Sequence, residues 1–149
     1  VVVGDVPYRD KYAEDLKKLA GEKVHFIGYV RDSDELMSLY QNCFCYIHGH
    51  QYGGTNPAML KAMSNNCAIL ALNTSFNSEM LTNGKFGLLF EESTESIQEQ
   101  MNNLEKDELL TKELRSAVSS GLTDKYNWDC VTTAYQKAMT DLCNSNSKK

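Results

Sequence analysis

The chain of 149 residues is long enough for one domain with a hydrophobic core, and its 42% hydrophobic and 23% charged residues exclude a disordered or fibrous protein. The net charge of −5 argues against nucleic acid as the main partner, because neutralising phosphates requires a basic face. The longest apolar runs are far shorter than the roughly 20 residues of a membrane-spanning helix.

Five short apolar runs recur along the chain at nearly regular spacing, separated by segments with helical periodicity. The runs cover residues 1–3, 24–27, 43–47, 67–72 and 86–90. The helical stripes are Tyr12, Leu16, Leu19 and Ala20, then Leu36, Leu39 and Tyr40, then Met59, Leu60 and Met63. Asp32, followed three residues later by Glu35, resembles a capping box at a helix start. Apolar strands that alternate with amphipathic helices predict an α/β fold with a buried parallel sheet and right-handed crossovers.

Three further helical stripes follow the fifth apolar run. They lie within residues 97–104, 110–118 and 128–142, and the second is predicted to stop at Gly121. We therefore predict one domain over residues 1–143, followed by a polar, disordered tail over residues 144–149. The chain begins on VVVG without a methionine, so we expect it to be a piece of a longer protein.

The five cysteines, an odd number, fall mostly within apolar stretches, so we predict that they are small buried side chains of a protein in a reducing, cytoplasmic compartment. The segment CFCYIHGH offers two cysteines and two histidines within eight residues, which raises the alternative of a zinc site. On a strand, however, Cys43 and Cys45 lie about 6.8 Å apart, too far to share a zinc ion with bonds near 2.3 Å unless the chain folds back. We therefore expect no metal, and zinc remains the minor alternative.

The most unusual loop, HGHQYGGTNP, follows the third predicted strand. Open parallel sheets bind their ligands beyond the carboxyl ends of the strands, where this loop lies. Pro57 suits the first turn of the next helix, and Thr55 or Asn56 can serve as its N-cap. Gly53 and Gly54 carry no side chains, so backbone amides can approach a ligand closely.

These amides and the positive end of the helix dipole together predict an anion site that would suit a diphosphate. His48 and His50, at the end of the strand, would lie within reach of the same anion or of a reacting sugar. The alternative is a tight strand-to-helix turn with no ligand, since Gly-Gly and Asn-Pro are common turn formers.

The block HGHQYGGTNP followed by MLKAM, residues 48–63, closely resembles the donor-site loop of the family-4 retaining glycosyltransferases, especially the rhamnosyltransferase-like branch. Other segments resemble this family in order and spacing: VVVGDVPY, VHFIGYVRDSDELMSLYQNC, CAILALNTSFNSEML, FGLLF and YNWDCVTTAYQKAM. The resemblance covers nearly the whole chain, and only residues 48–63 are highly specific. It implies a Rossmann-like parallel sheet flanked by helices, the second domain of a GT-B fold, with extra C-terminal helices.

The resemblance implies the donor-binding half of a glycosyltransferase of polysaccharide biosynthesis. Such an enzyme moves a sugar from a nucleotide-diphosphate donor to a glycan acceptor with retention, without a cofactor or an obligatory metal. The diphosphate and sugar would be held by Gly53, Gly54, Thr55 and Asn56, with His48 beside them. The nucleotide base would be flanked by Gly28, Tyr29 and Val30. His50 would border the sugar and is the catalytic candidate.

The chain departs from the family pattern at Lys61, where the family carries the glutamate that binds the ribose hydroxyls. Helical geometry places Lys61 about 200° from Met59 and Met63, so its side chain should point away from the core. A lysine has no acceptor for ribose hydroxyls. It could meet a phosphate, could mark a weakened donor site, or could be an ordinary surface residue.

The resemblance implies an acceptor domain and a segment with the family's diphosphate-binding arginine and lysine before the position of Val1, and we expect this chain to lack both. We therefore predict that this chain alone has no transferase activity. The expected partners are a nucleotide sugar, with rhamnose on thymidine diphosphate indicated by the branch, and a glycan or lipid-linked acceptor bound by the missing domain. The expected location is the cytoplasm, including the inner face of the membrane.

The sequence offers three alternatives to a transferase. The first is a non-catalytic sugar-nucleotide binding or interaction module, which Lys61 favours. The second is an epimerase or a phosphorylase on the same fold. The third, a receiver-type signalling domain, needs clustered aspartates at the strand ends, and Asp5 stands alone, so we set it aside.

Overall fold

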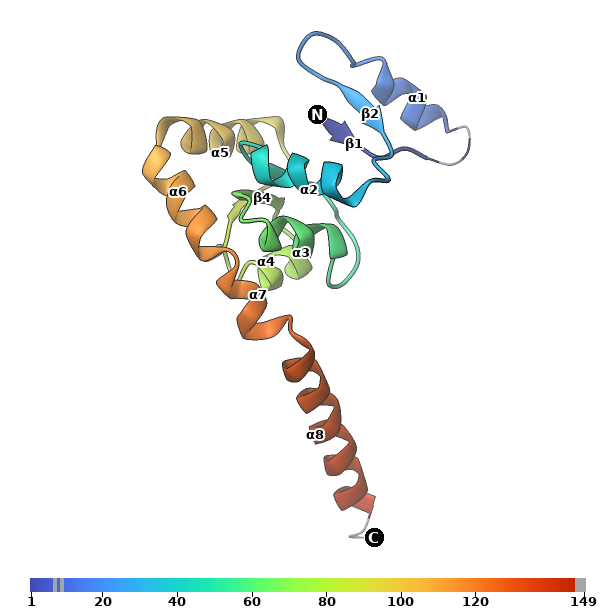
Figure 1. The fold of residues 1–149 in the computed structure, drawn as a ribbon, viewed down its shortest axis with the longest axis vertical. Coiled ribbons are helices and arrows are strands. Elements are labelled where there is room, and N and C mark those ends of the chain that lie inside the picture. The colour runs from blue at the N-terminus through green and yellow to red at the C-terminus, as the bar shows by residue number, and fades with distance from the viewer. Residues whose placement is uncertain (7, 9, 147–149) are drawn as a thin grey trace. The chain divides into compact units, whose positions relative to one another are not determined.

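The computed structural model describes residues 1–6, 8 and 10–146. Parallel strands alternate with helices, which confirms the predicted α/β fold, and the chain divides into two compact units, Val1–Leu39 and Tyr40–Lys149 (Figure 1). Whether residues 1–143 act as one donor-binding domain stays a prediction. Among the described residues, no helix combines the length and the apolar character that crossing a bilayer requires.

The first unit contains two short parallel strands and one complete helix. Its elements are β1 (Val2–Val3), α1 (Lys11–Lys17), β2 (Phe26–Gly28) and most of α2 (Ser33–Asn42). The side chain of Asp32 accepts hydrogen bonds from the backbone amides of Asp34 and Glu35, at 2.8 and 3.0 Å. This bonding confirms the helix start predicted at Asp32.

The second unit is built on a three-stranded parallel sheet in the order β3-β4-β5. Its strands are β3 (Tyr46–His48), β4 (Ile69–Leu72) and β5 (Leu88–Phe90). Its helices are α3 (Pro57–Ser64), α4 (Ser75–Met80), α5 (Thr94–Lys106), α6 (Glu108–Ala117), α7 (Ser120–Lys125) and α8 (Trp128–Asn146). Strand β4 pairs with a neighbour on each side and all four of its residues are buried, so it is the centre of the unit.

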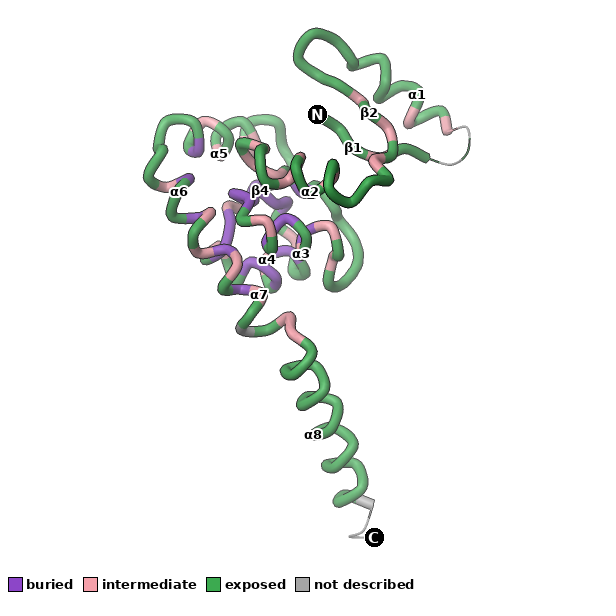
Figure 2. Tube along the Cα trace, in the orientation of Figure 1, coloured by how far each residue is buried: buried purple, intermediate pink, exposed green. Residues whose placement is uncertain are grey.

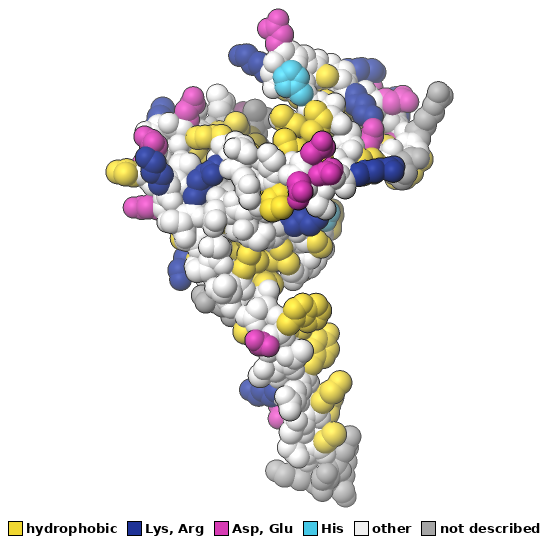
Figure 3. All heavy atoms as spheres, viewed as in Figure 1, with side chains coloured by type: hydrophobic (Ala, Val, Ile, Leu, Met, Phe, Trp, Pro, Cys, Tyr) yellow, Lys and Arg dark blue, Asp and Glu magenta, His cyan; other side chains and the backbone are white. Residues whose placement is uncertain are grey.

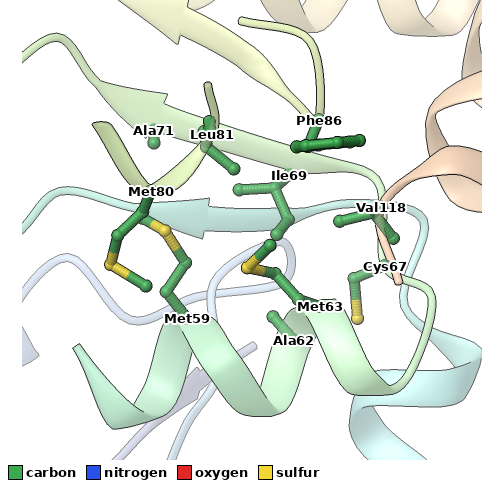
Figure 4. Packing of buried hydrophobic residues seen from close by; sticks show 10 residues of the cluster. All are labelled: Met59, Ala62, Met63, Cys67, Ile69, Ala71, Met80, Leu81, Phe86 and Val118. Atoms are coloured by element: carbon green, nitrogen blue, oxygen red, sulfur yellow. The ribbon is translucent and has the colours of Figure 1, made fainter. Parts of the chain in front are cut away.

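The side chains of β4 alternate between two hydrophobic clusters, as the period of two along a strand requires. Ile69 and Ala71 pack with buried residues of α3 and α4 in the larger cluster (Figure 4). Leu70 and Leu72 pack with Phe90 in a smaller cluster, which Ile97 of α5 also contacts. Helices therefore cover both faces of the sheet. The buried residues of the unit gather around this strand (Figure 2).

The structure corrects several predicted element boundaries. The apolar run at residues 43–47 forms a strand only from Tyr46, and the carbonyls of Cys43 and Phe44 before it accept hydrogen bonds from the guanidinium of Arg115. Gly121 does not end a helix but lies buried within α7, where a β-carbon would lie 2.8 Å from the ring of Phe86.

The last helix also differs from expectation. Helix α8 continues through residues 144–146, which were predicted to be disordered, while residues 147–149 lie outside the described part of the chain. Cys130 and Cys143, predicted to be buried, are exposed on this helix. The reason is that, among the described residues, none covers the apolar side of α8, whose hydrophobic side chains lie along the helix surface (Figure 3).

Candidate functional site

The loop from His48 to Asn56 connects the carboxyl end of β3 to the start of α3. The ends of β3 and β4 lie side by side, since His48 is paired with Ala71 in a parallel register. The loop therefore lies at the edge of the sheet where open α/β folds bind their ligands.

Asn56 caps α3 and satisfies the first amides of this helix. Its side-chain oxygen accepts hydrogen bonds from the amides of Ala58 and Met59, at 2.9 and 3.4 Å. The amide of Asn56 itself lies 3.4 Å from the sulfur of Met80, and Pro57 has no amide hydrogen. The predicted N-cap and the predicted proline position are confirmed. The amides at the helix start, however, already have partners within the protein.

Three consecutive amides just before the cap remain available. Within the described part of the chain, the amides of Gly53, Gly54 and Thr55 have no hydrogen-bond partner, and all three residues are exposed. The anion site predicted from the sequence is therefore narrowed to these three amides. Binding at them stays a prediction.

The backbone at position 53 requires glycine, because its φ of +128° is strongly disfavoured for residues that carry a side chain. A β-carbon on Gly53 would lie 3.5 Å from Nε2 of His50, so the loop brings the exposed imidazole of His50 against this glycine. A β-carbon on Gly54, in contrast, would meet nothing within 4 Å. The space beside Gly54 is open to a ligand.

His48, unlike His50, is buried, with an exposed fraction of 5%. Its Nδ1 lies 3.2 Å from the hydroxyl of Tyr46, and its Nε2 is buried without a partner in the described residues. Burial lowers the pKa of His48, and the nearby imidazole of His50 lowers it further. Burial also raises the pKa of Tyr46 to about 12. Near neutral pH, His48 is therefore an uncharged group that supplies no positive charge to an anion.

The buried imidazole predicts a pH-dependent stability. Because the folded chain disfavours the protonated form of His48, the unfolded chain binds this proton first as the pH falls below about 6.5. The free energy of unfolding should therefore decrease as the pH falls from about 7.5 to about 5.5. Urea denaturation at each pH measures this change.

His48→Gln should make the stability of the chain less dependent on pH over this interval. His25→Gln, which removes an exposed imidazole in the other unit, is the control and should keep the wild-type dependence. An unchanged slope in the His48 variant would contradict the burial of a neutral imidazole.

The side chain of Asn77 holds the loop in place, a role that the sequence did not reveal. This side chain has an exposed fraction of 3%, and its Nδ2 donates to the carbonyls of His50 and Leu72, at 3.0 and 2.9 Å. Thr74 fixes the start of α4 by accepting from the amide of Asn77. Helix α4 thus fastens the loop to the end of β4. The Thr-x-x-Asn spacing could have revealed the cap, but nothing local indicates the partners of Asn77.

Lys61 lies on the exposed side of α3, opposite the fully buried Met59 and Met63, which confirms the predicted direction of its side chain. The first turn of α3 contains no acidic residue. That Lys61 stands at the position of the family's ribose-binding glutamate stays a prediction.

An open cavity of about 420 Å³ lies beside the loop, at the carboxyl ends of β4 and β5. It is lined by Gly49, Gln51, Leu72, Phe90, Glu92, Ser93, Thr94 and Ile97. The side chain of Gln51 donates to Glu92 at 3.2 Å across this lining. With polar groups beside apolar ones, the cavity can contact both the hydroxyls and the ring carbons of a sugar.

The three residues predicted to flank the base belong to the first unit. Gly28 ends β2 with a φ of +71°, and its carbonyl accepts a hydrogen bond from the amide of Gly4 at 2.8 Å. The hydroxyl of Tyr29 donates to the carbonyl of Asp5, and Val30 is half-buried. A base could not use the Gly28 carbonyl without sharing it with Gly4. Contact of these residues with a base stays a prediction.

Comparison with known proteins bears on the family and the fold. The family model described as glycosyl transferases group 1 matches residues 1–120. Among solved structures, a sucrose-phosphate synthase from Thermosynechococcus elongatus superposes with a TM-score of 0.77 at 16% identity, over 96% of this chain. The chain spans 38% of that protein. A search of curated proteins finds no match. The structural similarity confirms the predicted Rossmann-like fold of GT-B type.

Proposed function

The chain belongs to the group 1 glycosyl transferases, and from this membership we propose that it is the donor-binding domain of an enzyme that uses a nucleotide-diphosphate sugar. The observation that carries the proposal is a row of three exposed residues at the carboxyl edge of the sheet, Gly53 to Thr55, whose backbone amides have no hydrogen-bond partner among the described residues. Successive backbone amides that point into solvent form concave sites for phosphate oxygens.

In the proposed complex, these amides bind the diphosphate. Their fixed dipoles stabilise the negative charge that develops on it as the bond to the sugar breaks. His50 lies against Gly53, so it would border the sugar. Asn56 acts as the cap that shapes the loop rather than as an amide donor, because its own amide faces Met80. The resemblance to the family-4 branch supports retention and a rhamnose donor carried on thymidine diphosphate.

We further propose that the acceptor, a glycan or a lipid-linked glycan, is bound by a domain outside this chain, at the cytoplasmic face of the membrane. The chain spans 38% of the solved relative, which leaves room for such a domain. On this proposal, the isolated chain binds the donor but transfers no sugar.

A second candidate function is a sugar-nucleotide binding module without catalysis. Lys61 favours it, because a cation cannot accept hydrogen bonds from the ribose hydroxyls as a carboxylate does. The longer protein that contains this chain separates the two functions when it is assayed across nucleotide sugars. Sugar transfer supports the enzyme, whereas binding of donors without turnover supports the module.

Nucleotide binding tests the proposed site directly. Titration of the chain with thymidine diphosphate, followed by amide NMR, should shift the signals of Gly53, Gly54 and Thr55 first. Gly53→Ala should weaken binding by about tenfold, or about 1.4 kcal/mol, because a side chain at a φ of +128° distorts the loop.

Gly84→Ala is the matched control, since Gly84 also has a positive φ, of +90°, but belongs to the turn after α4. It should carry a similar backbone strain and retain the wild-type affinity. Equal loss of affinity in the two variants, or shifts confined to residues outside the loop, would overturn the assignment of the site.

A further inference from the structure

Two thiols face each other at the end of the sheet opposite the loop site. Cys43 precedes β3, Cys67 precedes β4, and these strands are parallel neighbours. Their sulfur atoms lie 3.8 Å apart and share a hydrogen bond, and each sulfur also lies near the carbonyl of Tyr40, at 3.1 Å for Cys43 and 3.0 Å for Cys67. A disulfide bond is about 2.05 Å long, so closure requires the two sulfur atoms, now 3.8 Å apart, to approach by about 1.8 Å.

The surroundings make the two thiols unequal. The hydrogen bond with Cys67 and, to a lesser degree, the guanidinium of Arg115 together lower the pKa of Cys43 to about 7 against the effect of burial. The same hydrogen bond and burial raise the pKa of Cys67. Arg115 is held in place by the carbonyls of Cys43 and Phe44. Cys43 therefore carries the nucleophilic thiolate near neutral pH.

The exposure of the two residues matches these roles. Cys43 is half-buried and can meet a small oxidant, whereas Cys67 is completely buried behind it. A nucleophilic thiol that can meet an oxidant, beside a second thiol that can resolve it, is the arrangement found in redox-sensitive pairs. Cys45, two residues along, differs because burial raises its pKa.

We propose that Cys43 and Cys67 form a peroxide-sensitive dithiol that closes to a disulfide bond. The thiolate of Cys43 attacks one oxygen of hydrogen peroxide, the O–O bond breaks, and Cys43 becomes a sulfenic acid while the departing hydroxide takes a proton to form water. The sulfur of Cys67 then attacks the sulfenic sulfur and loses its proton, and a second water leaves. Two thiols are oxidised to one disulfide and one peroxide is reduced to two waters.

The crosslink would enclose residues 43–67, which contain β3, the glycine loop and all of α3. Oxidation would therefore restrict the unfolded chain around the candidate site and raise the thermal midpoint of unfolding. The proposal does not depend on the identity of the ligand that the loop binds.

The test uses the full chain with Cys130→Ser and Cys143→Ser, which remove the two exposed thiols of α8. After treatment with hydrogen peroxide, intact mass spectrometry should show the loss of two hydrogen atoms, and peptide mapping should place the link between Cys43 and Cys67. The thermal midpoint should rise and should return to its first value after reduction with dithiothreitol.

Three single variants in this background complete the test. Cys43→Ser should abolish the loss of mass, and Cys45→Ser, the matched control, should leave it intact. Cys67→Ala removes both the resolving thiol and the hydrogen-bond partner of Cys43, so it should leave a sulfenic acid on Cys43 that dimedone traps and that forms more slowly than in the background protein. A link that includes Cys45, or no loss of mass in the background protein, would overturn the proposal.

Discussion

Replacing Asn77 with leucine should lower the free energy of unfolding by about 3 kcal/mol. The buried amide of Asn77 is the hydrogen-bond donor to two carbonyls, those of His50 and Leu72, and leucine has nearly the same shape without the donor. The carbonyl of His50 would be left without a donor, at a cost of about 1–3 kcal/mol if it stays buried. The carbonyl of Leu72 would keep the amide of Thr74 at 2.9 Å and lose one hydrogen bond, worth about 1 kcal/mol. Urea denaturation monitored by circular dichroism measures the change.

Asn77→Leu should also weaken nucleotide binding, because the carbonyl of His50 would no longer be tied to the sheet. Asn103→Leu is the matched control: Asn103 is exposed on α5, and this change should alter stability by less than about 0.5 kcal/mol. A stability of Asn77→Leu equal to that of the control would refute the role of this side chain as the anchor of the loop.

Gly87→Ala should destabilise the chain by about 2 kcal/mol, since overpacking a core typically costs 1–3 kcal/mol. A β-carbon at this position would lie 2.9 Å from the carbonyl oxygen of Ile69 and 3.0 Å from a methyl carbon of Leu81. The carbonyl belongs to β4, which is paired on both sides and has little freedom to move.

Gly21→Ala serves as the control for Gly87→Ala. A β-carbon on Gly21 would meet nothing within 4 Å, and its backbone φ is not positive, so this change should be almost neutral or slightly stabilising. Thermal unfolding of both variants gives the comparison. Equal thermal midpoints of unfolding for the two variants would contradict the prediction, because they would show that β4 and β5 can move apart to accommodate the added methyl group.

The strands and the longer helices could be predicted from the sequence because each has a local pattern. Apolar runs marked the strands, and the stripe of Met59 and Met63 marked α3, whose buried face the structure confirms. Helix α4 was missed because its sequence, SFNSEM, is short and mostly polar, with no apolar stripe. It is held by its cap on Thr74 and by the burial of Met80 and Asn77.

The position of the candidate site could be predicted from the sequence, but its hydrogen bonds could not. Asn56 was one of two predicted N-cap residues, and the structure confirms it. Gly53 was predicted only for its missing side chain, and its positive φ was not expected. The anchoring role of Asn77 was not predictable, because its partner His50 lies 27 residues away along the chain. The burial of His48 was not predictable either, because the sequence does not show whether the side chain of a histidine that follows an apolar run points into the core or toward solvent.

The parallel sheet has a consequence for synthesis on the ribosome. In the second unit β3 pairs with β4 and β4 pairs with β5, and a crossover separates the two strands of each pair, so no two strands can join as a local hairpin. The nascent segment of β3 has no partner until Leu72 has left the exit tunnel, and β4 keeps an open edge until Phe90 follows. During that interval the strand segments remain exposed to solvent, and chaperones that shield such segments would act on this part of the chain.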